Sequence, residues 1–438
     1  MSSVKAGEIS LRTEAKRRGA AHYVTVGLAS LMGTTIEWYD FFLYGTAAAL
    51  VFNKLFFPNL DPLLGTLAAF GTYAVGFFAR PFGGLLFGHF GDRVGRKSML
   101  MITLFLMGIP TTLIGLVPTY DQIGLWAPLT LVTLRLIQGI SIGGEWGGAV
   151  LMSIEHAPEG KKGLFGALPQ AGVGFGLVLS SLAMAWVSKL PESDLFSWGW
   201  RVPFLASAIL LLLGWYIRVR IAESPAFEKF KSEGREVKVP ALEVIKSHPG
   251  ATLRVIGARI AEVTWFYTVV TFTLSYAANT LGIPKPMILN AIVFGAATII
   301  FTIPFFGHLG DRVGQKWLYA IGTVCLIGFA FPFFQLLQQK TELSIWLAII
   351  PALSLIYSIM YGPQSTMFAA QYPAEVRYSG ISLAVQVSGA IGGGLAPIVA
   401  TALLAANGGA TNYLSWYLIG LGVVAFLCSV TMRNKIHD

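Results

Sequence analysis

Seven ionisable side chains lie within long apolar stretches of this sequence, where a charge is costly. At the centre of a bilayer each charged form would cost about 2.5–3.5 kcal/mol, so each is expected to face a cavity or a partner. Such groups can bind protons, hold a charged ligand or form buried ion pairs. The seven residues are Glu37, Asp40, Arg80, Arg135, Glu145, Arg259 and Glu262.

Glu37 and Asp40 are three residues apart, which predicts that they share one face of a helix. Two partly desolvated carboxylates this close cannot both ionise cheaply, so at least one is expected to bind a proton. The alternative is a structural pair clamped by an arginine from a neighbouring helix. Asp40 is favoured slightly as the proton site because it lies further from the basic N-terminal segment. Glu262 and Glu145 are the next candidates.

Arg135 is the first candidate for binding an organic anion, because a guanidinium offers a rigid fork that matches a carboxylate. Gln138 lies on the same helical face and is expected to contribute to the same site. The alternative for Arg135 is a permanent ion pair with Glu37 or Asp40.

The other buried charges allow a structural role as well as a ligand role. Arg259 and Glu262 have the i,i+3 spacing of an internal ion pair, and Arg259 is also a candidate ligand for substrate. Glu145 stands among glycines and is either a buried structural acid or a proton site. Arg80 is expected to be structural.

The elements that position these residues are predicted to be membrane-spanning helices. Of 438 residues, 55% are hydrophobic and 12% are charged, about half of the roughly 25% usual in soluble domains. The ten-residue alternation of a membrane barrel is absent, so the fold class is an all-α polytopic membrane protein. Windows of about 20 apolar residues give twelve candidate spans, near 24–51, 63–88, 98–118, 125–154, 163–187, 200–221, 250–281, 287–307, 316–338, 344–369, 379–406 and 412–432.

The distribution of Lys and Arg predicts the orientation of these spans. With both termini in the cytoplasm, cytoplasmic segments hold 23 of the 31 basic residues and exterior loops hold five. The net charge of +9 is then explained by topology and by contact with anionic membrane lipids. Because the charge is spread over short loops, no nucleic-acid partner is expected. The N-terminal twenty residues lack the features of a cleaved signal peptide.

One ten-residue string occurs twice and divides the chain into halves. The copies begin at Gly88 and Gly307, match at eight of ten positions and are 219 residues apart. Each copy joins corresponding helices of two six-helix halves. The predicted organisation is an N-terminal bundle at 1–222, a cytoplasmic linker at 223–248 and a C-terminal bundle at 249–438.

This duplicated string and several other motifs resemble those of the major facilitator superfamily over the whole chain. The string at 88–97 resembles the signature of its loop between helices two and three, and Arg135-x-x-Gln138-Gly139 resembles its second signature. Further strings resemble the metabolite:proton symporter subfamily, which includes shikimate, α-ketoglutarate, citrate and proline/betaine carriers; the shikimate-permease branch looks nearest. These strings are Glu37-Trp-Tyr-Asp40-Phe, Arg80-Pro81, Gly143-Gly-Glu145-Trp-Gly-Gly148 and Ser197-Trp-Gly-Trp-Arg201.

The resemblance implies two pseudo-symmetric six-helix bundles around a central cavity lined by helices one, four, seven and ten. Helix two, which carries Arg80, is not expected to face that cavity. Further side chains that could shape a substrate site there or on helices five and eleven are Tyr44, Tyr267, Tyr361, Gln364, Gln170 and Gln386.

The repeated loops are expected to act as a cytoplasmic gate. Asp92 is expected to dock at a helix N-terminus near Ser379, and Arg96 to reach Glu155. By the repeat, Asp311 would dock near Gly163. The second copy has Gln315 in place of Arg96, which weakens any charge relay there. The residues assigned to the gate are Gly88, Asp92, Arg93, Gly95, Arg96, Glu155, Gly307, Asp311, Arg312 and Gly314.

Enzymatic and ATP-driven functions are not expected. No P-loop string occurs, so nothing would cradle nucleotide phosphates. Gly139-Ile-Ser141-Ile-Gly143 fits the hydrolase pattern in form but lies inside an apolar helix. Cys325 and Cys428 have no metal-ligand spacing and are expected to be inert. No cofactor or metal is expected, and transport against a gradient would need an ion, with the proton as the coupling ion.

The function implied is a proton-coupled symporter that imports a small organic acid, acting as a monomer in a bacterial inner membrane. A carrier of a zwitterionic osmolyte is the alternative with the same mechanism. A membrane sensor of the same fold and a channel are alternatives of other classes. The lack of an appended soluble domain argues against the sensor, and the duplicated body argues against a continuous pore.

Overall fold

The computed structural model describes residues 2–60, 62–220, 222–233 and 240–434. These residues form helices joined by short loops, and no strand occurs among them. Ten segments within this part of the chain are long and apolar enough to cross a membrane. The remaining two expected spans coincide with α1 and α3. The predicted all-α polytopic fold is confirmed.

The first bundle contains the six spans expected in the N-terminal half. Its elements are α1 Ser2–Ala47 with η1 Ala48–Phe52 and α2 Asn53–Leu55, α3 Pro62–Gly91, α4 Arg96–Ile114, α5 Tyr120–Ile123, α6 Trp126–Glu155, α7 Lys162–Ala167 with η2 Pro169–Ala171 and α8 Gly172–Val187, α9 Glu192–Asp194 with η3 Leu195–Gly199, and α10 Arg201–Val219.

The second bundle repeats this order after two short helices, α11 Pro225–Ser232 and α12 Pro240–Ser247. Its elements are α13 Pro249–Tyr267 with η4 Thr268–Phe272, α14 Thr273–Ser275 and η5 Tyr276–Thr280, α15 Lys285–Val313, α16 Gln315–Gln338, α17 Glu342–Pro351 with η6 Ala352–Tyr357 and α18 Ser358–Ala369, η7 Ala374–Val376, α19 Arg377–Ser388 with η8 Gly389–Gly394 and α20 Ala396–Ala406, and α21 Asn412–Val430.

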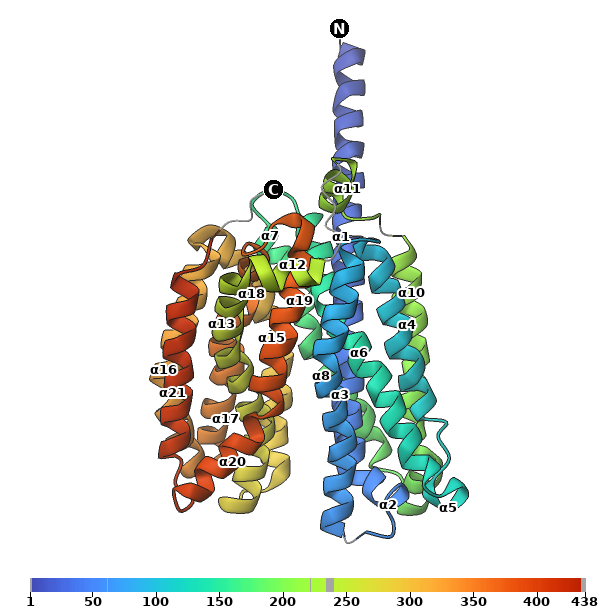
Figure 1. Ribbon diagram of the computed structural model, residues 1–438, viewed down its shortest axis with the longest axis vertical. Coiled ribbons are helices and arrows are strands. Elements are labelled where there is room, and N and C mark those ends of the chain that lie inside the picture. The colour runs from blue at the N-terminus through green and yellow to red at the C-terminus, as the bar shows by residue number, and fades with distance from the viewer. Residues whose placement is uncertain (1, 61, 221, 234–239, 435–438) are drawn as a thin grey trace.

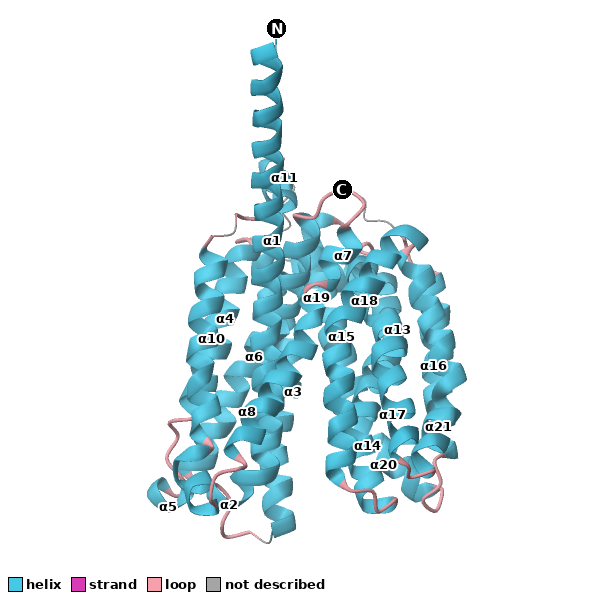
Figure 2. Ribbon diagram, turned by 180° about the vertical axis from the view of Figure 1, so that it is seen from behind, coloured by secondary structure: helices cyan, strands magenta, loops and turns pink. Residues whose placement is uncertain are grey.

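The two bundles stand side by side, with the N-terminal bundle coloured blue to green and the C-terminal bundle olive to red (Figure 1). Both chain ends and the short helices α7, α11 and α12 lie at one end of the molecule, which we call the terminal face. The ribbons of the two bundles converge toward this face (Figure 2). The seam there is formed by α3 packed on α19 and by α7 packed on α15 and α18.

A glycine with positive φ ends each copy of the repeated string and starts the next helix. Gly95 (φ 128°) precedes α4 and Gly314 (φ 104°) precedes α16. Residues with a Cβ rarely adopt this conformation, so glycine at both positions allows the same reversal of the chain in each half. The internal repeat read from the sequence is therefore also a repeat of backbone conformation.

Close packing of α3 on α6 depends on glycines that recur every four residues along α6. A Cβ at Gly139 would overlap the backbone of Gly76, and a Cβ at Gly143 would overlap the carbonyl of Arg80. The two backbones therefore touch, as small residues allow in membrane helices. Gly147, one turn further, faces Ser382 of α19 across the seam between the bundles.

Candidate binding cavity and gate

A small cavity of about 30 Å³ lies between the two bundles, large enough for ordered water. One wall comes from α1, α3 and α6, and the other from α13, η6, α18 and α19. Its polar lining residues are Glu37, Arg80, Arg259, Glu262, Tyr267, Tyr357, Tyr361 and Gln386, and its large apolar or aromatic neighbours include Trp38, Phe77, Trp146 and Phe266.

Glu37 brings a carboxylate to this cavity without an ion-pair partner among the described residues. The side chain is 4% exposed, and its Oε2 accepts no hydrogen bond there. A buried charge without a partner is costly. The negative charge of Glu37 can therefore be neutralised by a proton or balanced by a cationic group of a ligand.

Arg80 also faces the cavity, which corrects the expectation that helix two lies away from it. Its guanidinium lies over the rings of Phe41 (5.0 Å) and Phe77 (4.5 Å), and it has no carboxylate partner among the described residues. The physical reason is that α3 packs on both α6 and α19 and therefore borders the seam between the bundles. Cation–π contacts leave the guanidinium edge available for a carboxylate.

Arg259 and Glu262 form a loose pair on the opposite wall. Arg259 Nε lies 3.9 Å from Glu262 Oε2, and Arg259 donates to the carbonyl of Val385 (2.7 Å) and to Ser388 Oγ (3.2 Å). Glu262 Oε2 is buried without a hydrogen-bond donor among the described residues. This arrangement fixes Arg259 against α19 while Glu262 retains a free acceptor.

Asp40 belongs to a separate buried cluster inside the N-terminal bundle. Arg135 donates to Asp40 Oδ2 at 2.7 Å, while Gln138 and Thr111 donate to Oδ1 at 2.8 and 2.9 Å. Arg135 also lies 3.8 Å from the centre of the Tyr44 ring. The structure thus shows the ion pair that was one of the two alternatives for Arg135, and these residues do not line the cavity.

Glu37 and Asp40 therefore do not share a site. Residues three apart on an α-helix differ by about 60° in direction, which is enough to point Glu37 at the seam and Asp40 at α4 and α6. In place of the expected interaction between two adjacent carboxylates, Asp40 forms an ion pair, and Glu37 forms none with the residues that the structure describes.

Glu145 forms an ion pair with Arg218 of α10 and accepts a hydrogen bond of 2.6 Å from Thr103. Arg218 also donates to the carbonyl of Leu100 and is 2% exposed. Arg218 lies in the last turn of α10, and its long side chain extends back along the helix to this carboxylate. Gly33 makes room for this guanidinium, because a Cβ there would overlap it.

The remaining polar candidates divide into two groups. Tyr267, Tyr361 and Gln386 line the cavity, with Tyr361 stacked on Tyr357 at 4.7 Å. Three others make structural contacts elsewhere: Gln364 donates to Gln170 (3.0 Å), Gln170 donates to the carbonyl of Tyr361, and Tyr44 shares a hydrogen bond with Thr72 (2.6 Å).

Sequence reasoning missed the aromatic walls of the cavity. Trp38, Trp146 and Phe266 could have been singled out only by their neighbours in sequence, since Trp38 follows Glu37 and Trp146 follows Glu145. The indole nitrogens of Trp38 and Trp146 are buried and have no acceptor among the described residues. They are additional donors available to a ligand.

At the terminal face, Asp92 joins the two bundles as expected. The backbone N–H of Ser379 donates to Asp92 Oδ2 at 2.9 Å, and that of Tyr378 donates to Oδ1 at 3.3 Å. Gly88 permits this approach, because a Cβ there would lie 2.8 Å from the Cα of Ser379. Burial raises the pKa of Asp92 to about 6, although Arg96 and these amides oppose the shift.

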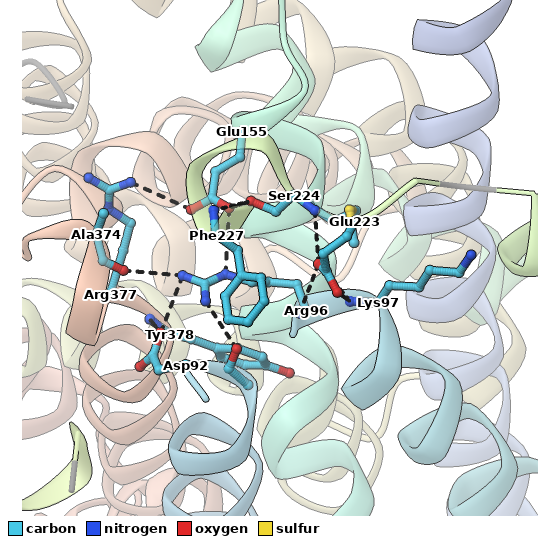
Figure 3. A network of polar contacts seen from close by, with 12 residues as sticks. Asp92, Arg96, Lys97, Glu155, Glu223, Ser224, Phe227, Ala374, Arg377 and Tyr378 are labelled. Atoms are coloured by element: carbon cyan, nitrogen blue, oxygen red, sulfur yellow. Dashed lines mark hydrogen bonds and ion pairs between the residues drawn. The ribbon is translucent and has the colours of Figure 1, made fainter. Parts of the chain in front are cut away.

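Arg96 and Glu155 extend this contact into a network across the seam. Arg96 lies 3.5 Å from Glu155 and 3.2 Å from Asp92, and it donates to the carbonyl of Ala374 at 3.2 Å. Glu155 also pairs with Arg377 of the other bundle at 3.5 Å (Figure 3). We call the contacts of Asp92, Arg96, Glu155 and Arg377 the first latch.

The second copy of the motif makes a smaller contact of the same kind. Asp311 accepts hydrogen bonds from the backbone N–H groups of Gly163 and Leu164, at 2.6 and 3.0 Å, and from Gln315 at 3.1 Å. We call these contacts the second latch. Gly307 packs against Gly163 beside it. Arg93 and Arg312, which were assigned to the gate, are exposed and take no part in the contacts that define the two latches.

The architecture and the gate motifs define a multi-pass membrane protein of the transporter class. A family model of the Major Facilitator Superfamily matches residues 31–397, and the chain belongs to this superfamily. It is 41% identical over 411 residues to the shikimate transporter of Escherichia coli K12, covering 93% of this chain and 94% of that protein. It is 33% identical over 424 residues to the proline/betaine transporter of the same strain, covering 93% and 83%.

Solved structures show the same fold. The proton:xylose symporter XylE bound to 6-bromo-6-deoxy-D-glucose superposes with a TM-score of 0.76 at 19% identity, covering 95% of this chain and 98% of that chain. An inward-open form of the xylose transporter from E. coli gives 0.61 at 19% identity, covering 94% and 96%. The chain is thus a metabolite transporter of this superfamily, and not an enzyme.

Proposed function

We propose that this protein is a proton-coupled symporter that imports a small organic acid by alternating access. It acts as a monomer in the inner membrane of a bacterium. The terminal face is the cytoplasmic side, because basic residues concentrate in the segments at that end. The observation that carries the proposal is Arg80, a guanidinium that shares a cavity with the acid Glu37; among the residues that the structure describes, neither side chain has an ion-pair partner.

The formal charges of the cavity support coupling between an anion and a proton. Its lining holds two carboxylates, Glu37 and Glu262, and two guanidiniums, Arg80 and Arg259, so the empty cavity is balanced when all four are ionised. Entry of a monocarboxylate leaves one uncompensated negative charge, which is costly in a buried site. A proton on Glu37 removes this charge, so the bound acid and the bound proton stabilise each other.

The substrate class follows from Arg80 and from the relatives. A guanidinium held over two aromatic rings presents its N–H groups to a carboxylate in bidentate geometry. The shikimate transporter of E. coli, whose name indicates a hydroxylated ring acid, shares 41% of aligned residues with this chain. A shikimate-like monocarboxylate is therefore the first substrate to test, and an α-ketoglutarate-like dicarboxylate the second.

The latches support alternating access. Both latches join the bundles at the terminal face, so the structure is closed on that side. Breaking them would let the bundles separate there while the interbundle cavity remains between them. During import, the substrate would enter the cavity from the face opposite the terminal face, and that face would then close. Release of both latches would open the terminal face and let the substrate leave.

An osmolyte carrier is the second candidate, favoured by one observation. Aromatic rings and two carboxylates surround the cavity, an environment that also suits a quaternary ammonium group. A zwitterion brings no net charge, so the charge argument above would not require a proton. The two candidates are therefore separated by which substrate is taken up.

The test is uptake by purified protein in liposomes. Labelled shikimate, α-ketoglutarate and glycine betaine are offered with an inward proton gradient and without one. The proposal predicts accumulation of an acid only with the gradient. Uptake of betaine but of neither acid would support the osmolyte carrier, and uptake of no substrate or gradient-independent uptake of every substrate would contradict symport.

A further inference from the structure

The loop before α4 is held in place by the segment that follows α10. Lys97 Nζ donates to the carbonyl of Val219 at 3.1 Å, at the C-terminus of α10. Four residues later, Glu223 accepts hydrogen bonds from the backbone N–H groups of Arg96 (3.0 Å) and Lys97 (3.2 Å). We call these contacts the first clasp (Figure 3). The first clasp therefore gives hydrogen-bond partners to a backbone carbonyl at the end of α10 and to two backbone N–H groups at the start of α4.

The loop before α16 is held in the same way by the segment that follows α21. Lys316 Nζ lies 3.5 Å from the carbonyl of Val430, at the C-terminus of α21. Four residues later, Asn434 Oδ1 accepts a hydrogen bond of 3.2 Å from the backbone N–H of Lys316. We call these contacts the second clasp.

The two clasps correspond although their sequences do not. Lys97 and Lys316 occupy the same position of the repeated string, and each contacts a carbonyl that lies four residues before the capping side chain. In both cases the glycine before the helix allows the capping group to approach. A Cβ on Gly95 would overlap Glu223, and a Cβ on Gly314 would lie 2.8 Å from Asn434 Nδ2.

The second clasp connects directly to the second latch. Gln315 is the first residue of α16 and donates to Asp311, the carboxylate that docks on α7 of the other bundle. At the end of α18, Gln371 exchanges two hydrogen bonds with the backbone of Arg433, at 3.0 and 3.1 Å. The C-terminal segment is thus fixed both to the loop that carries Asp311 and to α18.

The clasps differ in charge. Glu223 is a carboxylate that accepts from two successive amides, and its neighbour Ser224 donates to Glu155 of the first latch. Asn434 is neutral and accepts from one amide. A charged acceptor at a helix N-terminus forms stronger hydrogen bonds and interacts favourably with the helix dipole. The second clasp is therefore the weaker one.

We propose that Thr431–Asn434 acts as a second clasp that positions Asp311 in the gate, and that the neutral Asn434 makes the second latch the half that releases more readily. Asn434 is a positioning residue: it acts on the gate through Gln315 and Asp311. This inference does not depend on the identity of the substrate or of the coupling ion.

The test measures opening of the terminal face with a single cysteine. Ser382 is fully buried and faces Gly147 across the seam, so a cysteine there reacts only when the bundles separate at this face. The parent protein carries Ser382→Cys with Cys325→Ala and Cys428→Ala. A membrane-impermeant maleimide is applied to right-side-out and inside-out vesicles, and the labelling rate from the terminal face is measured.

Asn434→Ala is expected to raise this labelling rate by about threefold to tenfold, because loss of a helix-capping side chain shifts a conformational equilibrium by about this factor. Asn434→Asp is expected to lower the rate by a similar factor, because it places a charged acceptor at the N-terminus of α16. Glu223→Gln, which gives the first clasp a neutral cap, is expected to raise the rate. Arg433→Ala is the matched control, since Arg433 contributes only backbone contacts to Gln371, and is expected to label like the parent.

Two outcomes would overturn the proposal. One is an Asn434→Asp protein that labels as fast as the parent or faster, which remains measurable even if Asn434→Ala fails to fold. The other is an Arg433→Ala protein that labels as fast as Asn434→Ala, because the effect would then belong to the segment in general and not to the cap.

Discussion

Arg135 donates a hydrogen bond of 2.7 Å to Asp40, and the two side chains are 3% and 0% exposed. The two charges therefore balance each other inside the N-terminal bundle. Asp40 lies on a different face of α1 from Glu37, which lines the cavity. Breaking a buried ion pair by removing one partner leaves an uncompensated charge, which is much more costly than losing the pair. This relationship assigns Arg135 to the framework of the bundle.

Asp40→Asn is accordingly expected to destabilise the protein by about 3–5 kcal/mol, because the carboxylate that balances the buried charge of Arg135 is lost. The double variant Asp40→Asn with Arg135→Gln is expected to recover part of that loss. Thermal unfolding in detergent measures both. A stable Asp40→Asn protein in which only substrate affinity falls would show instead that Arg135 contacts substrate.

The fold was predictable because its signals are local. The length of an apolar run is set by bilayer thickness, and the repeated string at Gly88 and Gly307 marks the same turn in each half. The docking of Asp92 near Ser379 was predictable through the resemblance of the string at 88–97 to the loop motif of the superfamily, and it is physically favourable because the N-terminus of a helix attracts an anion. These inferences need no knowledge of how the helices are rotated.

The cavity was less predictable because it depends on helix rotation. Whether Glu37 or Asp40 faces the seam is decided by about 60° of rotation about α1. Arg80 reaches the cavity because the small residues of α6 hold α3 close beside it. Arg218 lies at the end of an apolar segment, and it is buried because its long side chain extends to Glu145 inside the bundle. None of these features leaves a periodic signal in a single sequence.

Glu37→Gln is expected to abolish proton-driven accumulation while retaining substrate binding and exchange, because a glutamine side chain mimics the protonated acid. Accumulation under an inward proton gradient and counterflow without a gradient are measured on the same liposomes. Glu262→Gln is the comparison in the same cavity: it removes one negative charge but keeps Glu37, so it is expected to weaken accumulation without abolishing it. Loss of accumulation in Glu262→Gln, with normal coupling in Glu37→Gln, would reassign the proton site.

Arg80→Gln is expected to weaken binding of the acid by about tenfold to hundredfold, the size of one charge-assisted hydrogen-bonded pair. Arg80→Lys is expected to recover part of this loss, since it keeps the charge but not the bidentate geometry. Equilibrium binding of labelled substrate measures the effect. Arg93→Gln, exposed in the gate loop, is the control, and equal losses in both variants would contradict a direct contact by Arg80.

The first latch is expected to strengthen at low pH, because burial raises the pKa of Asp92 to about 6. When the gate opens, this carboxylate meets water and its pKa returns toward the ordinary value of about 3.9. Closing therefore takes up a proton. This contribution to the closed form is fully present below about pH 4 and is lost as the pH rises through about 6.

Distances between one spin label on α3 and another on α19 measure this equilibrium from pH 4 to pH 8. The closed population at the terminal face is expected to fall by about fiftyfold relative to the open one across that range. Asp92→Asn cannot titrate, so its distance distribution should stay constant through pH 6. A titration near pH 6 that persists in Asp92→Asn would place the responsible group elsewhere, and the pH dependence would then not belong to the first latch.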